Sequence, residues 1–221
     1  MLTAASLCVT SAISIRDAAW PDVKHLANLC TDTFYGTHNI KNGPVIYLQR
    51  KRVLARVKQQ IGARIEEASM CERRLLVAES TSRVPVGMVD IAVHLYDTYT
   101  ERFELQATEI PAGGDYRFAW RPYVTSLAVQ PTWRRRGVAS LLMSSAEGVV
   151  VSWECEPEVM LEVEANNDVA LKFYRRNGYR VMDSGAALLA STAHTQTVVR
   201  AGLWWSRRPV AKLTMSKALY L

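Results

Sequence analysis

The sequence predicts one α/β domain built around a mixed β-sheet. Three observations lead to this prediction: short apolar runs alternate with segments of helical periodicity, a short turn joins the first pair of long strands, and helices separate the later strands. The chain has 221 residues, 49% of them hydrophobic and 22% charged, which is typical of a globular domain and excludes a disordered chain. We expect a flexible N-terminus at residues 1–11 and a single domain over residues 12–221.

In the first half of the chain, the hydrophobic pattern predicts a strand, two helices and a hairpin. The elements are a strand at 13–16, a helix that begins near Trp20-Pro21-Asp22 and includes Phe34, a helix at about 45–68, and strands at 74–79 and 86–93. Apolar residues from Leu54 to Ile65 share one face of the long helix, so the charged residues of its opposite face are expected to be solvated. Residues 35–44 form the loop between the two helices.

The second half predicts strands that alternate with helices. The elements are strands at 123–129, 160–164, 179–182 and 211–217 and helices at 137–151 and 169–176. Residues 97–121 and 184–210 fit none of these elements and are interpreted as insertions. The complete order is β-α-α-β-β-β-α-β-α-β-β, with an antiparallel start and parallel crossovers later.

The cysteine and histidine residues do not form a metal-binding pattern. The four cysteines and four histidines are scattered, without a C-x-x-C pair or an H-E-x-x-H helix, so we expect no metal and reduced thiols. No apolar run is long enough for a helix to span a membrane.

The net charge is +6, and +5 of it falls in residues 111–221. An anionic partner is therefore expected for this half, such as a phosphorylated small molecule, a nucleic acid or a membrane surface, although no nucleic-acid-binding signature is present. Residues 1–14 carry no charged side chain and so lack the basic region of a secretory signal. They are faintly like a transit peptide, but an unstructured terminus is the simpler interpretation.

The segment from Leu127 to Ala139 joins a strand to a helix through a basic loop, Arg134-Arg135-Arg136, followed by Gly137. A helix start presents unpaired backbone N–H groups and the positive end of the helix dipole, and glycine lets a ligand approach the backbone closely. This combination predicts a cradle for a pyrophosphate. The loop is neither a Walker A loop nor a G-x-G-x-x-G loop, and by itself it could be an ordinary connection.

Two blocks together resemble the GCN5-related N-acetyltransferase (GNAT) family. Arg134-x-x-Gly137-x-Ala139 matches the family's coenzyme A signature [QR]-x-x-G-x-[GA]. Asn167-x-x-Ala170-x-x-x-Tyr174-x-x-x-Gly178-Tyr179 matches its second conserved pattern. Within the family, the chain is similar to protein acetyltransferases of the ribosomal-protein alanine and plastid branches. The resemblance implies the GNAT fold, in which the parallel fourth and fifth strands splay apart.

The resemblance also implies the reaction and the cofactor contacts. The family transfers acetyl from acetyl-CoA directly to an amine, without a covalent enzyme intermediate and without a metal. The residues that would contact acetyl-CoA are Leu127, Ala128, Val129, Arg134, Arg135, Arg136, Gly137, Val138, Ala139, Ser140, Asn167, Ala170, Phe173 and Tyr174. Exposed backbone at the strand end would pair with the pantetheine arm, and Asn167 would bond the arm from the other side of the splay.

Tyr174 and Glu162 are the candidate acid and base. By resemblance, the Tyr174 hydroxyl protonates the departing thiolate, and Glu162 takes the proton of the acceptor amine. Glu162 lies 12 residues before Tyr174, which is the base–acid spacing of the ribosomal-protein branch. Strand alternation puts Glu164, a reserve candidate, on the same face as Glu162. A solvated pair of strand carboxylates is the alternative interpretation.

The acceptor is expected between residues 35–44 and 184–210. The second segment holds Trp204, Trp205, Arg207 and Arg208, which we hypothesise cover a peptide; burial of an apolar sheet face by the Trp pair is the alternative. A protein or peptide acetyltransferase acting on N-terminal amines, lysines or both is the first prediction. The alternatives are a small-amine (polyamine or arylalkylamine) acetyltransferase and a non-catalytic module that binds RNA, a ribosome or a protein complex. The plastid stroma is the expected compartment, with the cytoplasm as the alternative.

Overall fold

The structure is a computed structural model, and its chain divides into two compact units. The first unit comprises residues 1–91 and 126–149, and the second comprises residues 92–125 and 150–221. The described residues are 13–34, 44–68, 72–105, 107, 109–111, 113, 116–153, 155–182, 196–201, 204–209 and 212–219. The flexible N-terminus expected at 1–11 and residues 35–43 of the loop expected at 35–44 lie outside these residues, and Pro44 begins a helix.

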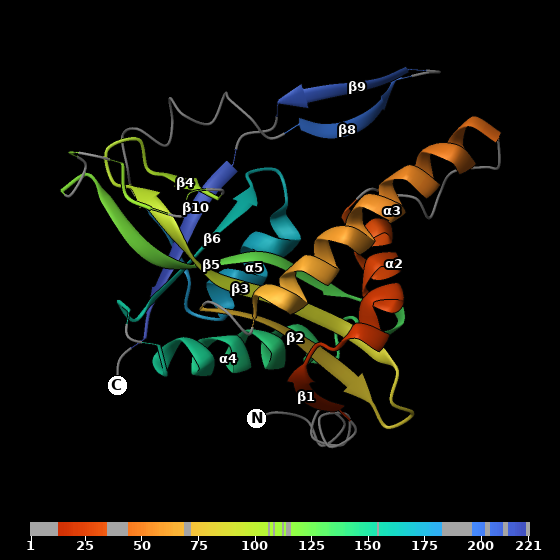
Figure 1. Ribbon diagram of the computed structural model, residues 1–221, viewed down its shortest axis with the longest axis horizontal. Helices are drawn as coiled ribbons and strands as arrows, with labels where there is room; N and C mark the ends of the chain where they lie inside the picture. Colours follow the sequence, from red (N-terminus) through yellow and green to blue (C-terminus); the bar gives the residue numbers. More distant parts are fainter. Residues whose placement is uncertain are drawn as a thin grey trace. The chain divides into compact units, whose positions relative to one another are not determined.

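The first unit contains the strand, two helices and hairpin that open the predicted order. Its elements are β1 (Ile13–Asp17), the 3₁₀ turn η1 (Trp20–Asp22), α2 (Val23–Phe34), α3 (Pro44–Glu67), β2 (Arg73–Ser80), the first part of β3 (Pro85–Asp97), the end of β5 (Phe118–Val129), the 3₁₀ turn η3 (Pro131–Trp133) and most of α4 (Val138–Val151). β1 pairs antiparallel with β2, and β2 neighbours β3. The helices α2 and α3 lie side by side (Figure 1).

The core of the first unit is formed by the apolar faces of α2 and α3 against the sheet. Its fully buried members include Leu26, Ile61, Leu75 and Met88. Cys30 belongs to the same cluster, with its Sγ 3.2 Å from the Met88 Sδ. Burial raises the pKa of the Cys30 thiol to about 12, so it behaves as a core side chain rather than a nucleophile.

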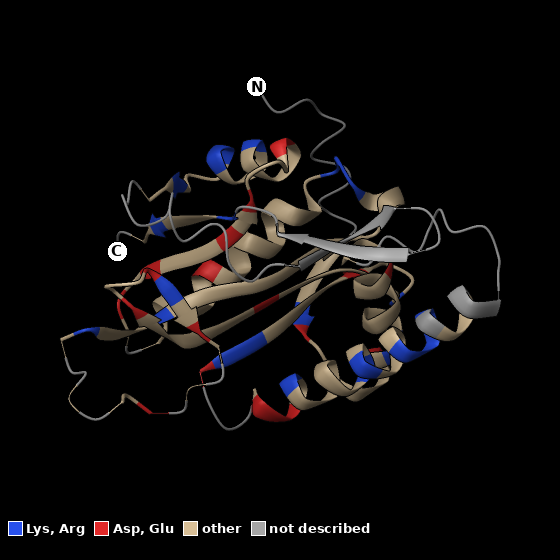
Figure 2. Cartoon of the chain, turned by 90° about the horizontal axis from the view of Figure 1, so that it is seen from above, with Lys and Arg blue, Asp and Glu red and all other residues tan. Residues whose placement is uncertain are grey.

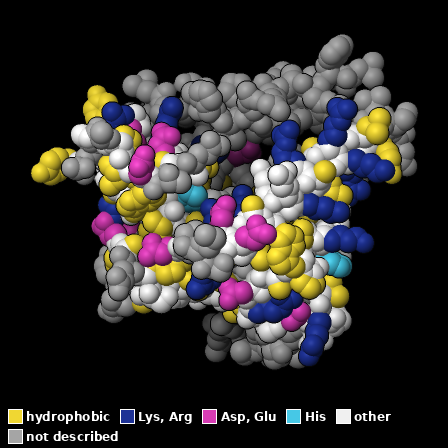
Figure 3. Space-filling model, viewed as in Figure 1, with side chains coloured by type: hydrophobic (Ala, Val, Ile, Leu, Met, Phe, Trp, Pro, Cys, Tyr) yellow, Lys and Arg dark blue, Asp and Glu magenta, His cyan; other side chains and the backbone are white. Residues whose placement is uncertain are grey.

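The charged face of α3 that the periodicity predicts to be solvated is exposed. Four of the five predicted residues are exposed, and Lys58 is half-buried; the exposed ones are Lys51, Arg52, Glu66 and Glu67. Basic side chains accordingly gather along α3 in the charge-coloured views (Figure 2, Figure 3). The apolar and charged residues of this helix therefore separate as the 3.6-residue period requires.

A buried carboxylate ties the end of α3 to the neighbouring strands. Asp90 of β3 is fully buried, and it accepts ion pairs of 3.1 Å from Arg64 of α3 and from Arg73 of β2. Arg73 also contacts Glu67 at 3.1 Å. Because a charge in the interior is tolerated only when it is paired, these two arginines are what allow Asp90 to occupy the core.

The second unit contains the parallel strand pair of the predicted sheet. Its elements are the end of β3, β4 (Arg102–Glu104), the start of β5, β6 (Glu158–Glu164), α5 (Asp168–Arg176), β7 (Arg180–Val181), β8 (Gln196–Ala201), β9 (Trp204–Pro209) and β10 (Lys212–Ala218). Within it the strands follow the order β4-β3-β5-β6-β10-β7. β5 and β6 run parallel and β10 runs antiparallel to β6, so the sheet is mixed as predicted.

The structure adds three strands to the predicted order, all within the two segments interpreted as insertions. β4 pairs with the end of β3, from Leu95 opposite Glu104 to Asp97 opposite Arg102. β8 and β9 form a separate antiparallel hairpin, from Gln196 opposite Pro209 to Ala201 opposite Trp204. The side chains of this hairpin lie outside the described residues, so the peptide-cover hypothesis for its Trp and Arg residues stays a prediction, as does the division into one domain with two insertions.

Asp97 holds the turn that follows β3. Its buried Oδ1 accepts the backbone N–H groups of Tyr99 at 2.9 Å and Thr100 at 3.1 Å, and its Oδ2 lies 2.6 Å from the Arg117 guanidinium. The hydrogen bond from Arg117 and those from the turn, which outweigh burial, hold the pKa of Asp97 well below its usual value.

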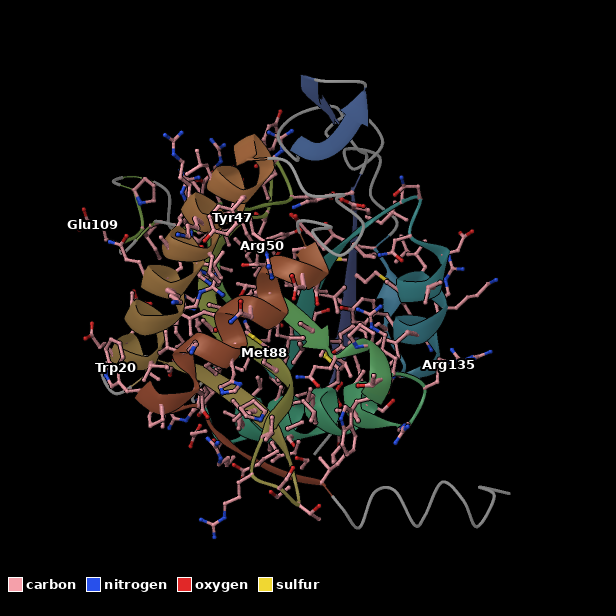
Figure 4. The ribbon with its side chains drawn as sticks, turned by 90° about the vertical axis from the view of Figure 1, so that its right-hand side faces the viewer. Trp20, Tyr47, Arg50, Met88, Glu109 and Arg135 are labelled. Carbon is pink, nitrogen blue, oxygen red and sulfur yellow. The ribbon has the colours of Figure 1, made fainter. Side chains whose placement is uncertain are left out.

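We expect Asp97 to make stability depend on pH in the acid range. Its folded pKa lies below the unfolded value of about 3.9, so its contribution is complete above that value and is lost as pH falls through the folded pKa. In thermal unfolding between neutral pH and pH ~3, Asp97→Asn should lose less Tm on acidification than the wild type. Glu109→Gln is the control, since Glu109 is exposed and points away from the fold (Figure 4). Equal acid slopes for Asp97→Asn and the wild type would contradict the assignment.

Candidate active site

The basic loop after β5 makes a tight turn before α4. The N–H groups of Trp133 and Arg134 donate to the carbonyls of Gln130 and Pro131, at 2.9 and 3.3 Å. Arg135 and Gly137 then adopt left-handed backbone, with φ of 62° and 82°. The Leu141 N–H donates to the Gly137 carbonyl at 3.0 Å, so Gly137 is the capping residue at which α4 begins.

The first turn of α4 has backbone N–H groups without partners in the helix. The N–H groups of Val138, Ala139 and Ser140 precede the first intrahelical hydrogen bond, so they have no partner within the helix. A Cβ added to Gly137 would meet no atom within 4 Å, so the space beside this residue is open. The N–H donors and the open space that a pyrophosphate cradle needs are thus present in the first unit, and the cradle itself stays a prediction.

The three loop arginines have three different environments. Arg134 turns back, and its Nε donates to the Val129 carbonyl at 3.0 Å, which braces the end of β5. Arg136 stacks over Trp133, with its guanidinium carbon 5.4 Å from the ring centroid. Arg135 is exposed and projects outward from the loop (Figure 4). Of the preceding strand residues, Leu127 is half-buried and Ala128 and Val129 are buried.

Replacing Gly137 by alanine should weaken acetyl-CoA binding and should lower the stability of the fold by a similar free energy. A non-glycine residue at φ 82° costs about 1–2 kcal/mol, and its relaxation would re-aim the N–H groups of the cradle. We expect the Kd for acetyl-CoA, measured calorimetrically, to rise by about tenfold, the equivalent of one lost hydrogen bond of ~1.4 kcal/mol. Gly148→Ala in the same helix is the matched control, because its Cβ also meets nothing within 4 Å while its φ is helical. Unchanged binding by Gly137→Ala would contradict the cradle.

The parallel ladder between β5 and β6 is short. It pairs Tyr123 with Met160 and Val124 with Leu161, whereas the other edge of β6 pairs with β10 as far as Glu164. Beyond Leu161, β6 therefore continues without β5 as a ladder partner. The two strands therefore separate after Leu161, as the predicted splay requires, and Glu162 is the first residue of β6 beyond this point.

Glu162 lies among polar partners on this stretch of β6. Its Oε2 is 2.6 Å from the Lys212 Nζ of β10, and the Tyr123 hydroxyl donates a hydrogen bond to its carboxylate. Burial, and after it the charge of Glu162, holds the pKa of Tyr123 well above its usual value. Tyr123 was not among the predicted site residues, because only the β5–β6 register brings it to Glu162.

Tyr174 lies on α5 with its ring between two aromatic neighbours. The ring centroids of Phe173 and Tyr179 are 5.2 and 5.8 Å away. Burial raises the pKa of Tyr174 to about 12. The interaction with Tyr174 is also one of the causes that raise the pKa of Tyr123. The Tyr174 hydroxyl makes no hydrogen bond within the described part of the chain, so it is available to a ligand. Tyr123, Glu162, Tyr174 and Lys212 are called the acid–base cluster below.

Asn167 serves as the cap of α5. Its Oδ1 accepts the Ala170 N–H at 3.1 Å, which leaves its amide nitrogen as a donor for a ligand such as the pantetheine arm. Glu164, the reserve base, is half-buried and stands opposite Lys212 in the β6–β10 ladder. Glu162 has a phenol and an ammonium as partners, and its role as the base stays a prediction.

Two absences apply to the described residues. They contain no cluster of three or more His, Cys, Asp or Glu side chains that could hold a metal ion. None of their helices combines the length and apolar character needed to cross a bilayer.

Sequence comparison finds the same family as the two motifs. The sequence pattern of the Acetyltransferase (GNAT) family matches residues 55–179, more than half of the chain. GCN5-related N-acetyltransferase 4, chloroplastic, of Arabidopsis thaliana is 26% identical over 78% of this chain and 62% of its own length. The N-alpha-acetyltransferase MAK3 of the same plant is 41% identical over 30% of this chain and 34% of its own length. The chain thus spans less than two thirds of each of these relatives.

Comparison of folds adds two solved structures. The PaiA N-acetyltransferase of Thermoplasma acidophilum, solved with coenzyme A, has a TM-score of 0.59 at 16% identity and covers 94% of this chain and 99% of its own. The ribosomal-protein-alanine N-acetyltransferase of Brucella melitensis has a TM-score of 0.55 at 17% identity and covers 93% of this chain and 99% of its own. At these identities the two structures establish the fold.

Proposed function

Because the chain belongs to the acetyltransferase (GNAT) family, we propose that it transfers the acetyl group of acetyl-CoA directly to an amine of a protein or peptide. The acceptor is an N-terminal α-amine, a lysine ε-amine, or both. The observation that carries the proposal is the acid–base cluster, in which Glu162 holds an ammonium group at 2.6 Å and interacts with the Tyr123 phenol, and Tyr123 in turn interacts with Tyr174.

The cradle of the first unit is the proposed binding site for the pyrophosphate of the cofactor. Coenzyme A supplies the acetyl thioester and two phosphate groups linked as a pyrophosphate. The N–H groups of residues 138–140 bind the pyrophosphate, and Arg135 and Arg136 add positive charge. The Asn167 amide nitrogen donates to the pantetheine arm. No metal takes part in this assignment.

Glu162 and Tyr174 have separate roles: Glu162 accepts a proton from the amine, and Tyr174 stabilises the departing sulfur. The Glu162 carboxylate takes the proton of the acceptor ammonium, and the hydrogen bond from Tyr123 keeps that carboxylate oriented. Tyr174 donates a hydrogen bond to the departing sulfur. Since the pKa of Tyr174 is about 12 and that of a free thiol is about 8.5, the phenol stabilises the thiolate as a donor before any proton moves.

The polar partners of Glu162 favour a peptide over a polyamine. A polyamine carries several ammonium groups and needs several carboxylates, but Lys212 already neutralises Glu162. The names of the relatives, an N-alpha-acetyltransferase and a chloroplastic GCN5-related acetyltransferase, also support a protein acceptor. A small-amine acetyltransferase is therefore the second candidate. The chloroplastic relative further supports the plastid stroma as the compartment, with the cytoplasm as the alternative.

The test is acetylation of two peptide libraries, one with free and one with blocked N-termini, read by mass spectrometry. Acetylation of free N-termini, of internal lysines, or of both supports the proposal and identifies the acceptor class. If spermidine or an arylalkylamine is acetylated and neither library is, the protein is a small-amine acetyltransferase and the proposed peptide acceptor is wrong. Absence of acetyl-CoA binding in calorimetry would instead favour a non-catalytic module.

A further inference from the structure

Lys212 presents an amine to the proposed base of its own chain. We propose that the protein acetylates its own Lys212, so that this side chain is a modification site. The inference rests on the proposed function, because it uses the same donor and the same acid–base cluster. It goes beyond that function by naming a specific internal acceptor.

The geometry meets the first requirement of an acceptor. An amine that is to lose a proton must lie within about 2.6–3.2 Å of its base, or be connected to it by one water. The Lys212 Nζ lies 2.6 Å from the Glu162 Oε2, and the Tyr123 hydroxyl bonds the same carboxylate. The ammonium of Lys212 thus occupies the position that any substrate amine must reach.

The strand register keeps Lys212 at that position. β10 pairs with β6 so that Lys212 stands opposite Glu164 and Thr214 opposite Glu162, which makes Lys212 a diagonal neighbour of Glu162. An amine fixed in this way has a high effective concentration relative to a dissolved one. The side chain is also 35% exposed, so it is not enclosed in the core.

Lys217 provides an internal comparison on the same strand. It lies five residues further along β10, and an odd separation places it on the opposite face of the strand. Its Nζ stacks over the Tyr179 ring, 5.8 Å from the centroid. Lys217 therefore shares the strand with Lys212 but not the contact with Glu162.

The step balances without any further reagent. Glu162 takes a proton from the Lys212 ammonium, and the freed Nζ attacks the acetyl carbonyl of acetyl-CoA. The new bond is the amide between Nζ and the carbonyl carbon, and the bond that breaks is the thioester C–S bond. The electron pair leaves on the sulfur of coenzyme A, which Tyr174 stabilises. The nitrogen loses a second proton as the amide forms, so that one of the two protons restores the thiol and the other passes to solvent. Acetylated Lys212 is uncharged and can no longer pair with Glu162.

The test is incubation of the full chain with isotope-labelled acetyl-CoA, followed by intact mass and peptide mapping. We expect one acetyl group, located on Lys212, at a rate per molecule that does not change with protein concentration. Lys212→Arg should abolish this label, Lys217→Arg should retain it, and Glu162→Gln should slow it by about 100-fold or more, the usual contribution of a general base.

Three results would overturn the proposal. They are a Lys212 that stays unmodified, labelling of Lys217 at an equal rate, and labelling of Lys212 that is as fast in Glu162→Gln as in the wild type, since the last two indicate uncatalysed chemistry. Peptide acetylation is measured in the same reactions, so that failure of this inference can be distinguished from failure of the proposed function. Peptide turnover without modification of Lys212 refutes the inference and leaves the proposed function standing, whereas loss of both refutes both.

Discussion

Tyr174→Phe should lower kcat for peptide acetylation by about 10²–10⁴-fold, the range for loss of a group that acts on a proton in the transition state. The substitution removes one hydroxyl and keeps the ring against Phe173 and Tyr179, so the fold should be unaffected. Since the leaving sulfur gains charge only in the transition state, kcat and kcat/KM should fall together. The measurement is steady-state kinetics with saturating acetyl-CoA.

Two comparisons make this result specific to the hydroxyl of Tyr174. Tyr116→Phe changes a fully exposed tyrosine and should leave kcat at the wild-type value. The wild-type rate should show no alkaline decline from Tyr174 below about pH 11, because its pKa is raised to about 12 and the phenol stays protonated. A wild-type kcat in Tyr174→Phe would mean that another group assists the thiolate.

Asp90→Ala should lower the free energy of unfolding by about 3–5 kcal/mol, the usual cost of breaking a buried ion pair by removing one partner. The carboxylate is fully buried, so its removal leaves the guanidinium groups of Arg64 and Arg73 without their shared anion in the core. The measurement is urea unfolding followed by circular dichroism, with acetyl-CoA absent.

Asp32→Ala is the matched control for Asp90→Ala. Asp32 pairs with Arg50 at 3.0 Å in the same unit, but the Arg50 side chain is 44% exposed, and such pairs contribute about 0–1 kcal/mol. The two variants therefore remove the same chemical group from environments that differ in burial. An equal, small effect of both substitutions would show that Asp90 is not the anchor between α3 and the sheet.

The fold follows from the sequence wherever a pattern is long. The helical periodicity of α3 and the apolar runs of β2 and β3 extend over many residues, and the structure has these elements within a few residues of the predicted bounds. β4 has three residues and depends on pairing with the end of β3, so local sequence does not specify it. Among the described strands, β8 and β9 pair only with each other, and the apolar and polar residues of this segment do not alternate clearly.

The candidate site was predictable only where a family motif covers it. Asn167, Ala170 and Tyr174 follow from their spacing, and the cradle follows from Arg134 and Gly137. The neighbours of Glu162 lie far from it along the chain, Tyr123 before it and Lys212 after it. They meet because a parallel and an antiparallel ladder flank β6, and this register is a tertiary property that no local pattern encodes.

The central claim is that this chain transfers acetyl from acetyl-CoA to a peptide amine, and one assay tests it directly. Purified protein is incubated with acetyl-CoA and a peptide with a free amine, and free coenzyme A thiol and acetylated peptide are measured together. We predict that the two products appear in equal amounts and that both require the Tyr174 hydroxyl and the Glu162 carboxylate. Thiol release without acetylated peptide, or neither product although acetyl-CoA binds, would contradict the claim.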